Sequence, residues 1–167
     1  MKQIGMKYGL FTGLFYIVVG TLNFMFEFSA SSTMAGIGTW VVTFGITFAI
    51  VYVAVKEYRE EFGSMSAREG LKLGVTIGLI AGVIAAVFTF IYTQWLDPDA
   101  MTRQLQATMD AMEDKGMSDE EIEATMSISK KFMDPMFTLP VTIISYTIGG
   151  LIKGAISGSI LKKDVPV

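Results

Sequence analysis

Four stretches of this sequence are long and apolar enough to cross a lipid bilayer, which takes about 20 predominantly apolar residues. They cover residues 8–26, 34–55, 71–96 and 136–161. The chain has 167 residues, of which 51% are hydrophobic and 17% are charged, and its apolar runs are far longer than a soluble core segment requires. The sequence therefore predicts one all-α integral membrane domain over residues 1–167, built as a four-helix bundle.

The first stretch lies near the start of the chain, where a secretory signal peptide would also lie. Its uncharged run from Tyr8 to Phe26 exceeds the length of a signal-peptide core, although Ser29 to Ser31 resemble a cleavage site. We expect this stretch to be retained as a membrane span.

Lysine and arginine are distributed unevenly among the segments outside the spans. Nine of the 13 basic residues lie near the two ends of the chain or between spans two and three. They are Lys2, Lys7, Lys56, Arg59, Arg68, Lys72, Lys153, Lys162 and Lys163. The link over residues 97–135 holds four basic residues against ten acidic ones, and the turn from Glu27 to Thr33 holds no basic residue. The positive-inside rule therefore predicts cytoplasmic termini and an external 97–135 link.

The external link has the pattern of an amphipathic helical hairpin. Asp97 can cap a helix that has Pro98 at its first position. Ser118 and Glu121 have the spacing of a capping box for a second helix. Apolar residues recur at helical spacing along both segments. We expect this hairpin to lie on the membrane surface or over the ends of the spans, either as a structural lid or as a docking surface.

Small residues recur every four positions on three of the four spans, and such rows allow membrane helices to approach closely. The rows contain Gly9 and Gly13 in the first span, Gly70, Gly74, Gly78, Gly82 and Ala86 in the third, and Gly150, Gly154 and Gly158 in the fourth. We expect these rows to pack within one bundle in preference to an oligomer or partner interface. The row of the third span should contact a helix of the same chain.

The chain also shows a short internal similarity. Lys7 is followed by glycines at positions 9 and 13, and Lys72 is followed by glycines at positions 74 and 78. Because both copies start on the same side, a duplication would give two parallel-repeat hairpins, one from spans one and two and one from spans three and four. Chance similarity between glycine-rich helices is the alternative.

Few residues within the spans can carry chemistry. Apart from Lys72 at the very start of the third stretch, Lys153 is the only charge there. It lies roughly 12 Å along the helix from Leu161, so we expect it to snorkel to the surface or contact a lipid headgroup in preference to forming a substrate site. Asn23 and Tyr146, together with Tyr16, Ser145, Thr142 and Thr147, can line a polar path or bond across helices.

The composition excludes several common activities. The chain has no Cys and no His, which removes thiolate catalysis, disulfides and the usual metal ligands. The methionines of the external link give at best a weak copper site, and its acidic run lacks the spacing of a calcium loop. No face is basic enough for nucleic acid. We expect no cofactor, no metal and no enzymatic activity.

The order of short motifs resembles a family of small bacterial four-span membrane proteins catalogued as domain of unknown function number forty-one ninety-nine. The resembling segments are Lys7 to Gly9, Tyr58 with Arg59, Gly70 to Gly74, Asp97 to Asp99, Ser118 to Glu123, and Asp134 with Pro135, whereas Ser64 to Ala67 depart from the family pattern. The resemblance implies a bacterial inner-membrane protein, suggests a partner in envelope assembly, and transfers no activity.

Two functions are consistent with these features. The first is a non-enzymatic accessory or scaffold subunit of a membrane or envelope-assembly complex, which would contact membrane lipids and a membrane protein partner or a second copy of itself. The alternative is a small carrier of lipid or neutral solute, built around the polar path. Copurification of a fixed partner would favour the first, and transport by the purified protein would favour the second.

Overall fold

The computed structural model describes residues 1–26, 33–131 and 133–162, and its elements are all helical. They are α1 (Lys2–Phe26), α3 (Thr33–Phe62), α4 (Ala67–Ile91), the π-helical turn η1 (Tyr92–Leu96), α5 (Ala100–Glu113), α6 (Asp119–Lys131) and α7 (Pro135–Ile160). This confirms the all-α prediction. Ser29 to Ser31 and Lys163 lie outside the described residues.

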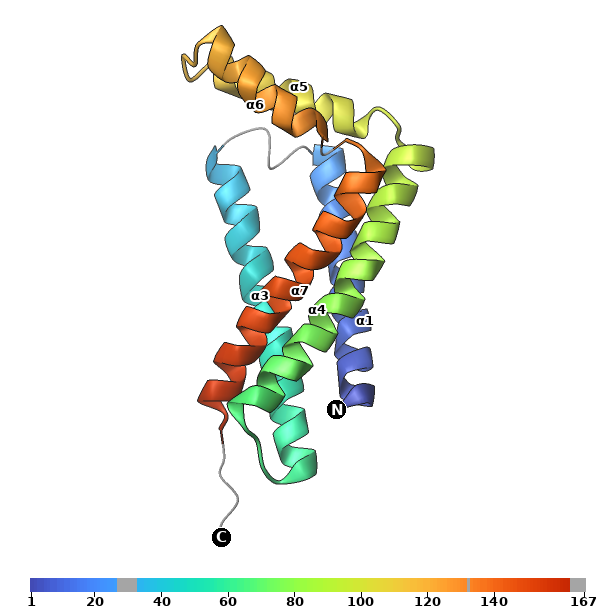
Figure 1. Ribbon diagram of the computed structural model, residues 1–167, viewed down its shortest axis with the longest axis vertical. Helices are drawn as coiled ribbons and strands as arrows, with labels where there is room; N and C mark the ends of the chain where they lie inside the picture. Colours follow the sequence, from blue (N-terminus) through green and yellow to red (C-terminus); the bar gives the residue numbers. More distant parts are fainter. Residues whose placement is uncertain (27–32, 132, 163–167) are drawn as a thin grey trace.

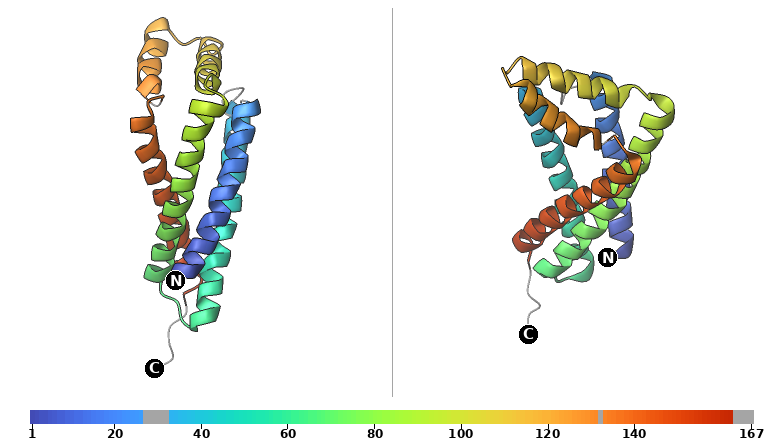
Figure 2. Two further views of the ribbon diagram at one scale, coloured as in Figure 1. Left: turned by 90° about the vertical axis from the view of Figure 1, so that its right-hand side faces the viewer. Right: turned by 45° about the horizontal axis from the view of Figure 1, so that its top comes forward.

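Four of these helices, α1, α3, α4 with η1, and α7, are long and apolar enough to cross a membrane. In Figure 1, α1 and α4 rise from the lower end, whereas α3 and α7 descend toward it. Helices α5 and α6 lie across the upper end, and Figure 2 shows that they diverge from the loop that joins them. The start of α1 and the end of α7 therefore lie at the same end of the molecule.

Helix α4 packs most extensively on α7, and glycine lines both sides of the contact. The α4 row at 70, 74 and 78 is buried against the α7 row at 150, 154 and 158. A Cβ atom placed on Gly74 would lie 2.7 Å from the Cα of Gly154 and would point at the carbonyl oxygen of Gly150. The glycine hydrogen in that position faces a carbonyl, a contact that recurs between closely packed helices.

The α4 row continues upward with larger partners. Gly82 lies against the backbone of Ile143, and Ala86 is 2% exposed.

The glycine row of α1 packs against side chains of α4. A Cβ atom on Gly9 would lie 2.8 Å from the Cβ of Ile80, and one on Gly13 would lie 2.9 Å from the Cβ of Ile84. The α4 helix thus presents glycine to α7 and a β-branched ridge to α1, so it is the central helix of the packing.

The packing does not reproduce the predicted pair of equivalent hairpins. In a repeat, Gly9 and Gly13 would meet α3 as Gly74 and Gly78 meet α7, but they meet α4. Helix α1 also packs more extensively on α4 than on α3. The reason is steric, because the α1 glycines form a groove that accepts the Ile80 and Ile84 side chains.

The ends of the shorter helices follow local hydrogen bonding. The predicted capping box at Ser118 is confirmed: the backbone N–H of Ser118 donates to Glu121 at 2.9 Å, and the backbone N–H of Glu121 donates to the Ser118 hydroxyl at 3.4 Å. These bonds from Ser118 lower the pKa of Glu121.

The predicted cap at Asp97 is wrong. Helix α5 begins at Ala100 with Asp99 as its N-cap residue, and the Asp97 carboxylate accepts two hydrogen bonds from Arg103, at 2.6 and 3.1 Å. Asp97 itself ends the π-helical turn η1, because its backbone N–H donates to the carbonyl of Tyr92 at 2.8 Å, and a turn over Pro98 and Asp99 separates it from α5.

The lower end of the bundle is closed. A buried cluster there includes Val51, Val55, Leu73 and Ile77. Beside it, Glu57 on α3 accepts hydrogen bonds from the amine of Lys7, at 2.9 and 3.1 Å, and from the hydroxyl of Tyr8 on α1, at 2.5 Å. These contacts fasten α1 to α3 at this end.

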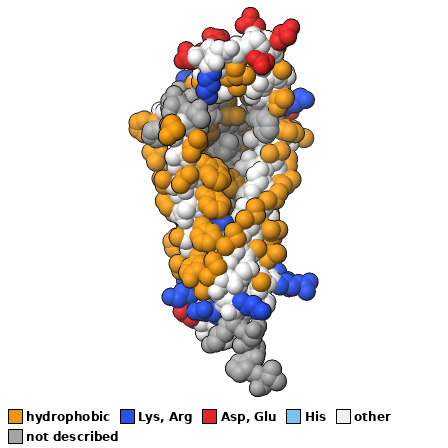
Figure 3. Space-filling model, turned by 90° about the vertical axis from the view of Figure 1, so that its left-hand side faces the viewer, with side chains coloured by type: hydrophobic (Ala, Val, Ile, Leu, Met, Phe, Trp, Pro, Cys, Tyr) orange, Lys and Arg blue, Asp and Glu red, His pale blue; other side chains and the backbone are white. Residues whose placement is uncertain are grey.

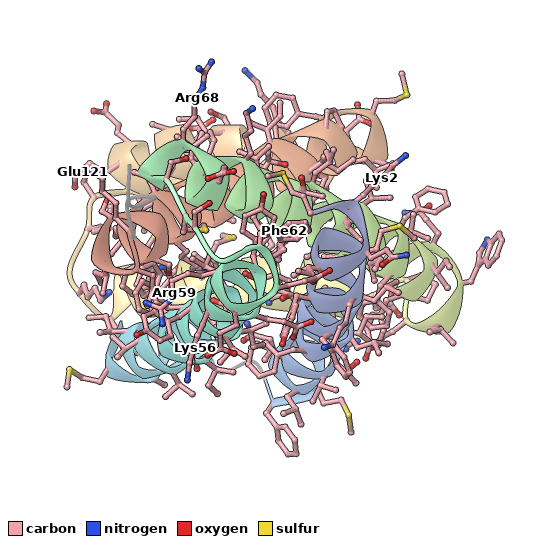
Figure 4. The ribbon with its side chains drawn as sticks, turned by 90° about the horizontal axis from the view of Figure 1, so that it is seen from below. Lys2, Lys56, Arg59, Phe62, Arg68 and Glu121 are labelled. Carbon is pink, nitrogen blue, oxygen red and sulfur yellow. The ribbon has the colours of Figure 1, made fainter. Side chains whose placement is uncertain are left out.

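Charge separates the two ends of the molecule. Seen from below, Lys2, Lys56, Arg59 and Arg68 surround the lower end (Figure 4). Acidic side chains gather at the opposite end, over α5 and α6, and hydrophobic side chains cover the surface between (Figure 3). An apolar belt between two charged ends is the surface that a membrane-spanning bundle requires.

Candidate functional site

A cavity of about 600 Å³ lies among the four long helices, above the closed lower end. It forms because α3 is packed less closely than α4 against its neighbours. Figure 3 shows a hollow between two columns of hydrophobic side chains, on the face that lies at the left of Figure 1. The volume falls within the range of small-molecule sites in proteins.

Two facing helices supply the front walls of the cavity. Residues on α3 recur at spacings of three and four, and they include Trp40, Thr43, Phe44 and Thr47. A stripe on α7 with the same periodicity includes Ser145, Tyr146, Gly149 and Lys153. Because these spacings keep side chains on one helical face, each helix contributes a continuous wall of mixed apolar and hydroxyl character.

The back of the cavity is formed by α1 and α4. Tyr16 and Asn23 come from α1, and Phe88 comes from α4. The ring of Tyr16 packs on that of Tyr146, with their centroids 4.1 Å apart. The back wall therefore combines aromatic surface with hydroxyl and amide groups.

Lys153 occupies the lower part of this cavity. Its side chain is 5% exposed, and its Nζ donates a hydrogen bond of 2.7 Å to Oγ1 of Thr47. The Nζ also lies 5.0 Å from the ring centroid of Phe44, a cation–π contact. Thr47 in turn donates to the carbonyl oxygen of Thr43 at 2.7 Å. Two neighbouring turns of α3 thus hold the amine.

The expectation that Lys153 snorkels to the surface is wrong. Its position on α7 directs the side chain toward α3, where the Thr47 hydroxyl accepts its hydrogen bond. Gly149, one turn earlier, lies beside the amine, because a Cβ placed there would be 4.0 Å from the Nζ of Lys153, an ordinary contact distance.

The amine is incompletely satisfied by the protein. An ammonium group has three N–H donors. Within residues 1–26, 33–131 and 133–162, one donor goes to Thr47, and no other acceptor or carboxylate lies within bonding distance of Nζ. A buried ammonium without a counter-charge is costly, and ionisable groups inside membrane helices commonly mark functional sites.

The structure brings together part of the predicted site and separates the rest. Asn23, Tyr146 and Lys153, which were predicted as possible polar-path or lipid-contact residues, all line this one cavity, as do Tyr16 and Ser145. Thr147 instead donates to the carbonyl of Ile143 within its own helix. The glycine rows lie in the α1–α4 and α4–α7 contacts.

Sequence reasoning missed the α3 wall. The signal was present in the spacing of Gly36, Thr39, Thr43 and Thr47, which places a small and polar stripe on one face of the second span. This stripe lacks the repeated glycines that drew attention to the other three spans.

A smaller cavity of about 90 Å³ lies where the spans meet the upper helices, beside Gln94, Met101 and Met133. Among the residues that the structure describes, none with a charged side chain lines it. For metals, the described part of the chain contains no group of three or more His, Cys, Asp or Glu that could hold an ion. The larger cavity is therefore the candidate functional site.

The four helices that are long and apolar enough to cross a membrane are compatible with a multi-pass membrane protein. The chain belongs to the family described as Protein of unknown function (DUF4199), whose sequence pattern matches residues 7–163. No curated protein and no solved structure matches the chain significantly.

Proposed function

We propose that this protein binds one amphipathic molecule within the membrane and acts as a small carrier. The observation that carries the proposal is the cavity among α1, α3, α4 and α7, which has an aromatic interior and polar groups at fixed positions. Binding sites for small molecules commonly combine a mostly apolar wall with a few placed polar groups. The proposal includes no catalytic step.

The residues at the opening of the cavity support the proposal that the ligand has an apolar part. Trp40, Ile148 and Ile152 line the cavity and are also 66%, 51% and 45% exposed. They lie within the apolar belt, on helices long enough to span the bilayer. A ligand could therefore enter sideways from the membrane between α3 and α7 without passing through water.

We further propose that the protein resides in the bacterial inner membrane with both termini in the cytoplasm. The ring of basic side chains at the lower end supports this orientation through the positive-inside rule. Helices α5 and α6 would then cover the external mouth of the bundle as an amphipathic hairpin.

A purified sample tests the carrier proposal. The protein is extracted with native lipid and examined by native mass spectrometry for a bound amphiphile. Gly149→Leu places a large side chain in the cavity, whereas Gly45→Leu is the matched control, because a Cβ at Gly45 has no neighbour within 4 Å and Gly45 does not line the cavity. Wild type and Gly45→Leu should retain the ligand and Gly149→Leu should lose it. Equal occupancy in both variants would contradict the proposal.

An accessory or scaffold role is the second candidate. The exposed carboxylates of Asp119, Glu120 and Glu123 at the start of α6 favour it, because they form an acidic surface for a partner with a basic patch. Replacing all three with Lys should abolish copurification of a fixed partner in mild detergent. A complex that survives this replacement would rule out this surface as the docking site.

A further inference from the structure

We infer that the cavity recognises an anionic headgroup, a phosphate or carboxylate on an apolar chain, through the amine of Lys153. This inference rests on the proposed function and specifies the chemical class of its ligand. It excludes the neutral solute that sequence reasoning left open.

The amine of Lys153 has hydrogen-bond donors that the described part of the protein does not use. Lys153 is held by Thr47 and Phe44, and two of its three N–H donors point to no acceptor among the described residues. Spans two to four contain no Asp or Glu between residues 34 and 55, 73 and 96, or 136 and 161, so the sequence provides no carboxylate at this depth. An oxyanion from outside the chain would supply both the missing charge and the missing acceptors.

The amine of Lys153 lies at the lower end of the cavity. Directly below it, Ser157 and Leu161 continue the same face of α7, and their exposures are 0% and 6%. The buried cluster containing Val51 and Leu73 closes this end. Lys153 therefore lies at the closed lower end of the cavity. If the charged group of a ligand contacts Lys153, the rest of the ligand must extend toward the upper half of the cavity.

The upper half of the cavity is mostly aromatic and apolar. Its walls include the aromatic rings of Tyr16, Phe88 and Trp40, and its border is the exposed apolar surface of α7. A free inorganic anion would leave this surface without a partner. An alkyl or prenyl chain attached to the anion would fill it and could continue into the bilayer between α3 and α7.

Trp40 provides a reporter for a binding experiment. The chain has two tryptophans, and Trp95 is 75% exposed on η1, outside the cavity. In a Trp95→Phe background, the fluorescence of Trp40 reports occupancy of the full-length protein in phosphatidylcholine nanodiscs. The probes are dodecyl phosphate, dodecanoate, the neutral dodecanol of equal chain length, and inorganic phosphate.

The inference predicts that both anionic amphiphiles bind at least about tenfold more tightly than dodecanol, as expected for one hydrogen bond to a charged group. Lys153→Met should abolish this ratio and leave the dodecanol affinity unchanged. Lys153→Gln can still donate to Thr47 and should also abolish the ratio, which keeps the test valid if the Met variant does not fold. Lys72→Met, on the exposed start of α4, is the control and should behave as wild type.

Each other outcome has a distinct meaning. If dodecanol binds wild type as tightly as the anionic probes, or if the ratio survives in the Lys153 variants, the role of Lys153 is refuted while the carrier proposal stands. If inorganic phosphate binds as tightly as dodecyl phosphate, the ligand is a soluble anion and the inference is overturned. If no amphiphile changes the Trp40 signal, the carrier proposal itself fails.

Discussion

The glycine contact between α4 and α7 makes a sharp prediction for stability. Gly74→Ala places a methyl group where the Cα of Gly154 is only 2.7 Å away and where the carbonyl oxygen of Gly150 lies directly ahead. Carbon atoms in ordinary contact are about 3.5–4.0 Å apart. Backbone atoms cannot rotate aside as a long side chain can, so the two helices must separate by roughly 1 Å.

This separation of the two helices destabilises the folded protein. Forcing extra volume into a tight contact costs about 1–3 kcal/mol. The gain in helix propensity from Gly to Ala offsets up to about 1 kcal/mol of that cost. We therefore expect Gly74→Ala to lower the free energy of unfolding by about 0–2 kcal/mol relative to wild type, and by about 1–3 kcal/mol relative to an Ala variant that gains the same helix propensity without a clash.

Two other glycines serve as controls on the same background. A Cβ at Gly20 would have Phe88 at 3.5 Å, which is ordinary contact, and a Cβ at Gly45 would have no neighbour within 4 Å. Both Ala variants should be neutral or more stable than wild type. The free energies are measured by titrating dodecyl maltoside micelles with sodium dodecyl sulfate and following far-ultraviolet circular dichroism. If Gly74→Ala is as stable as Gly45→Ala, the two helices are not packed backbone to backbone.

Three further predictions concern the Lys153 amine, the Asp97–Arg103 pair and the orientation of the chain. Thr47→Val removes the acceptor of the Lys153 amine and should lower the free energy of unfolding by about 1–3 kcal/mol in the same titration. An unchanged free energy of unfolding would contradict the burial of the Lys153 amine against Thr47. The Arg103 guanidinium lowers the pKa of Asp97, so this pair stabilises the fold above the unfolded pKa of about 4, and that contribution is lost as the pH falls through the folded pKa. Asp97→Asn should accordingly reduce the acid dependence of thermal unfolding, and an unchanged pH profile would contradict the pairing. Because the chain has no Cys, Glu123→Cys should react with an impermeant maleimide in whole cells and Arg59→Cys should react only after permeabilisation, whereas the reverse pattern would invert the orientation.

The helical architecture could be predicted because its signals are local. Length and hydropathy alone predicted the four membrane-length helices, and the spacing of Ser118 and Glu121 predicted the start of α6. The prediction that Asp97 caps α5 failed because Asp97 and Asp99 both flank Pro98 and either could cap the helix. Asp97 ends η1, and α5 begins after Asp99.

The candidate site was harder to predict because it depends on the register between helices. The α4 row indicated a close contact, but the sequence alone could not specify that Gly74 lies against Gly150 and Gly154. Lys153 has a stem long enough to reach the surface, and its inward direction is decided by Thr47, which is 106 positions away in the sequence. No local pattern could reveal that pairing.

Photocrosslinking in native-like membranes tests the central claim most directly. An alkyl phosphate that carries a diazirine near its headgroup is activated in vesicles containing the full-length protein, and the labelled peptides are mapped. The account predicts labels at the closed lower end of the cavity, on the α3 and α7 segments around Phe44, Thr47 and Lys153. Labels confined to the lipid-exposed faces, such as Leu14 on α1 and Val87 on α4, and insensitive to Gly149→Leu would contradict it.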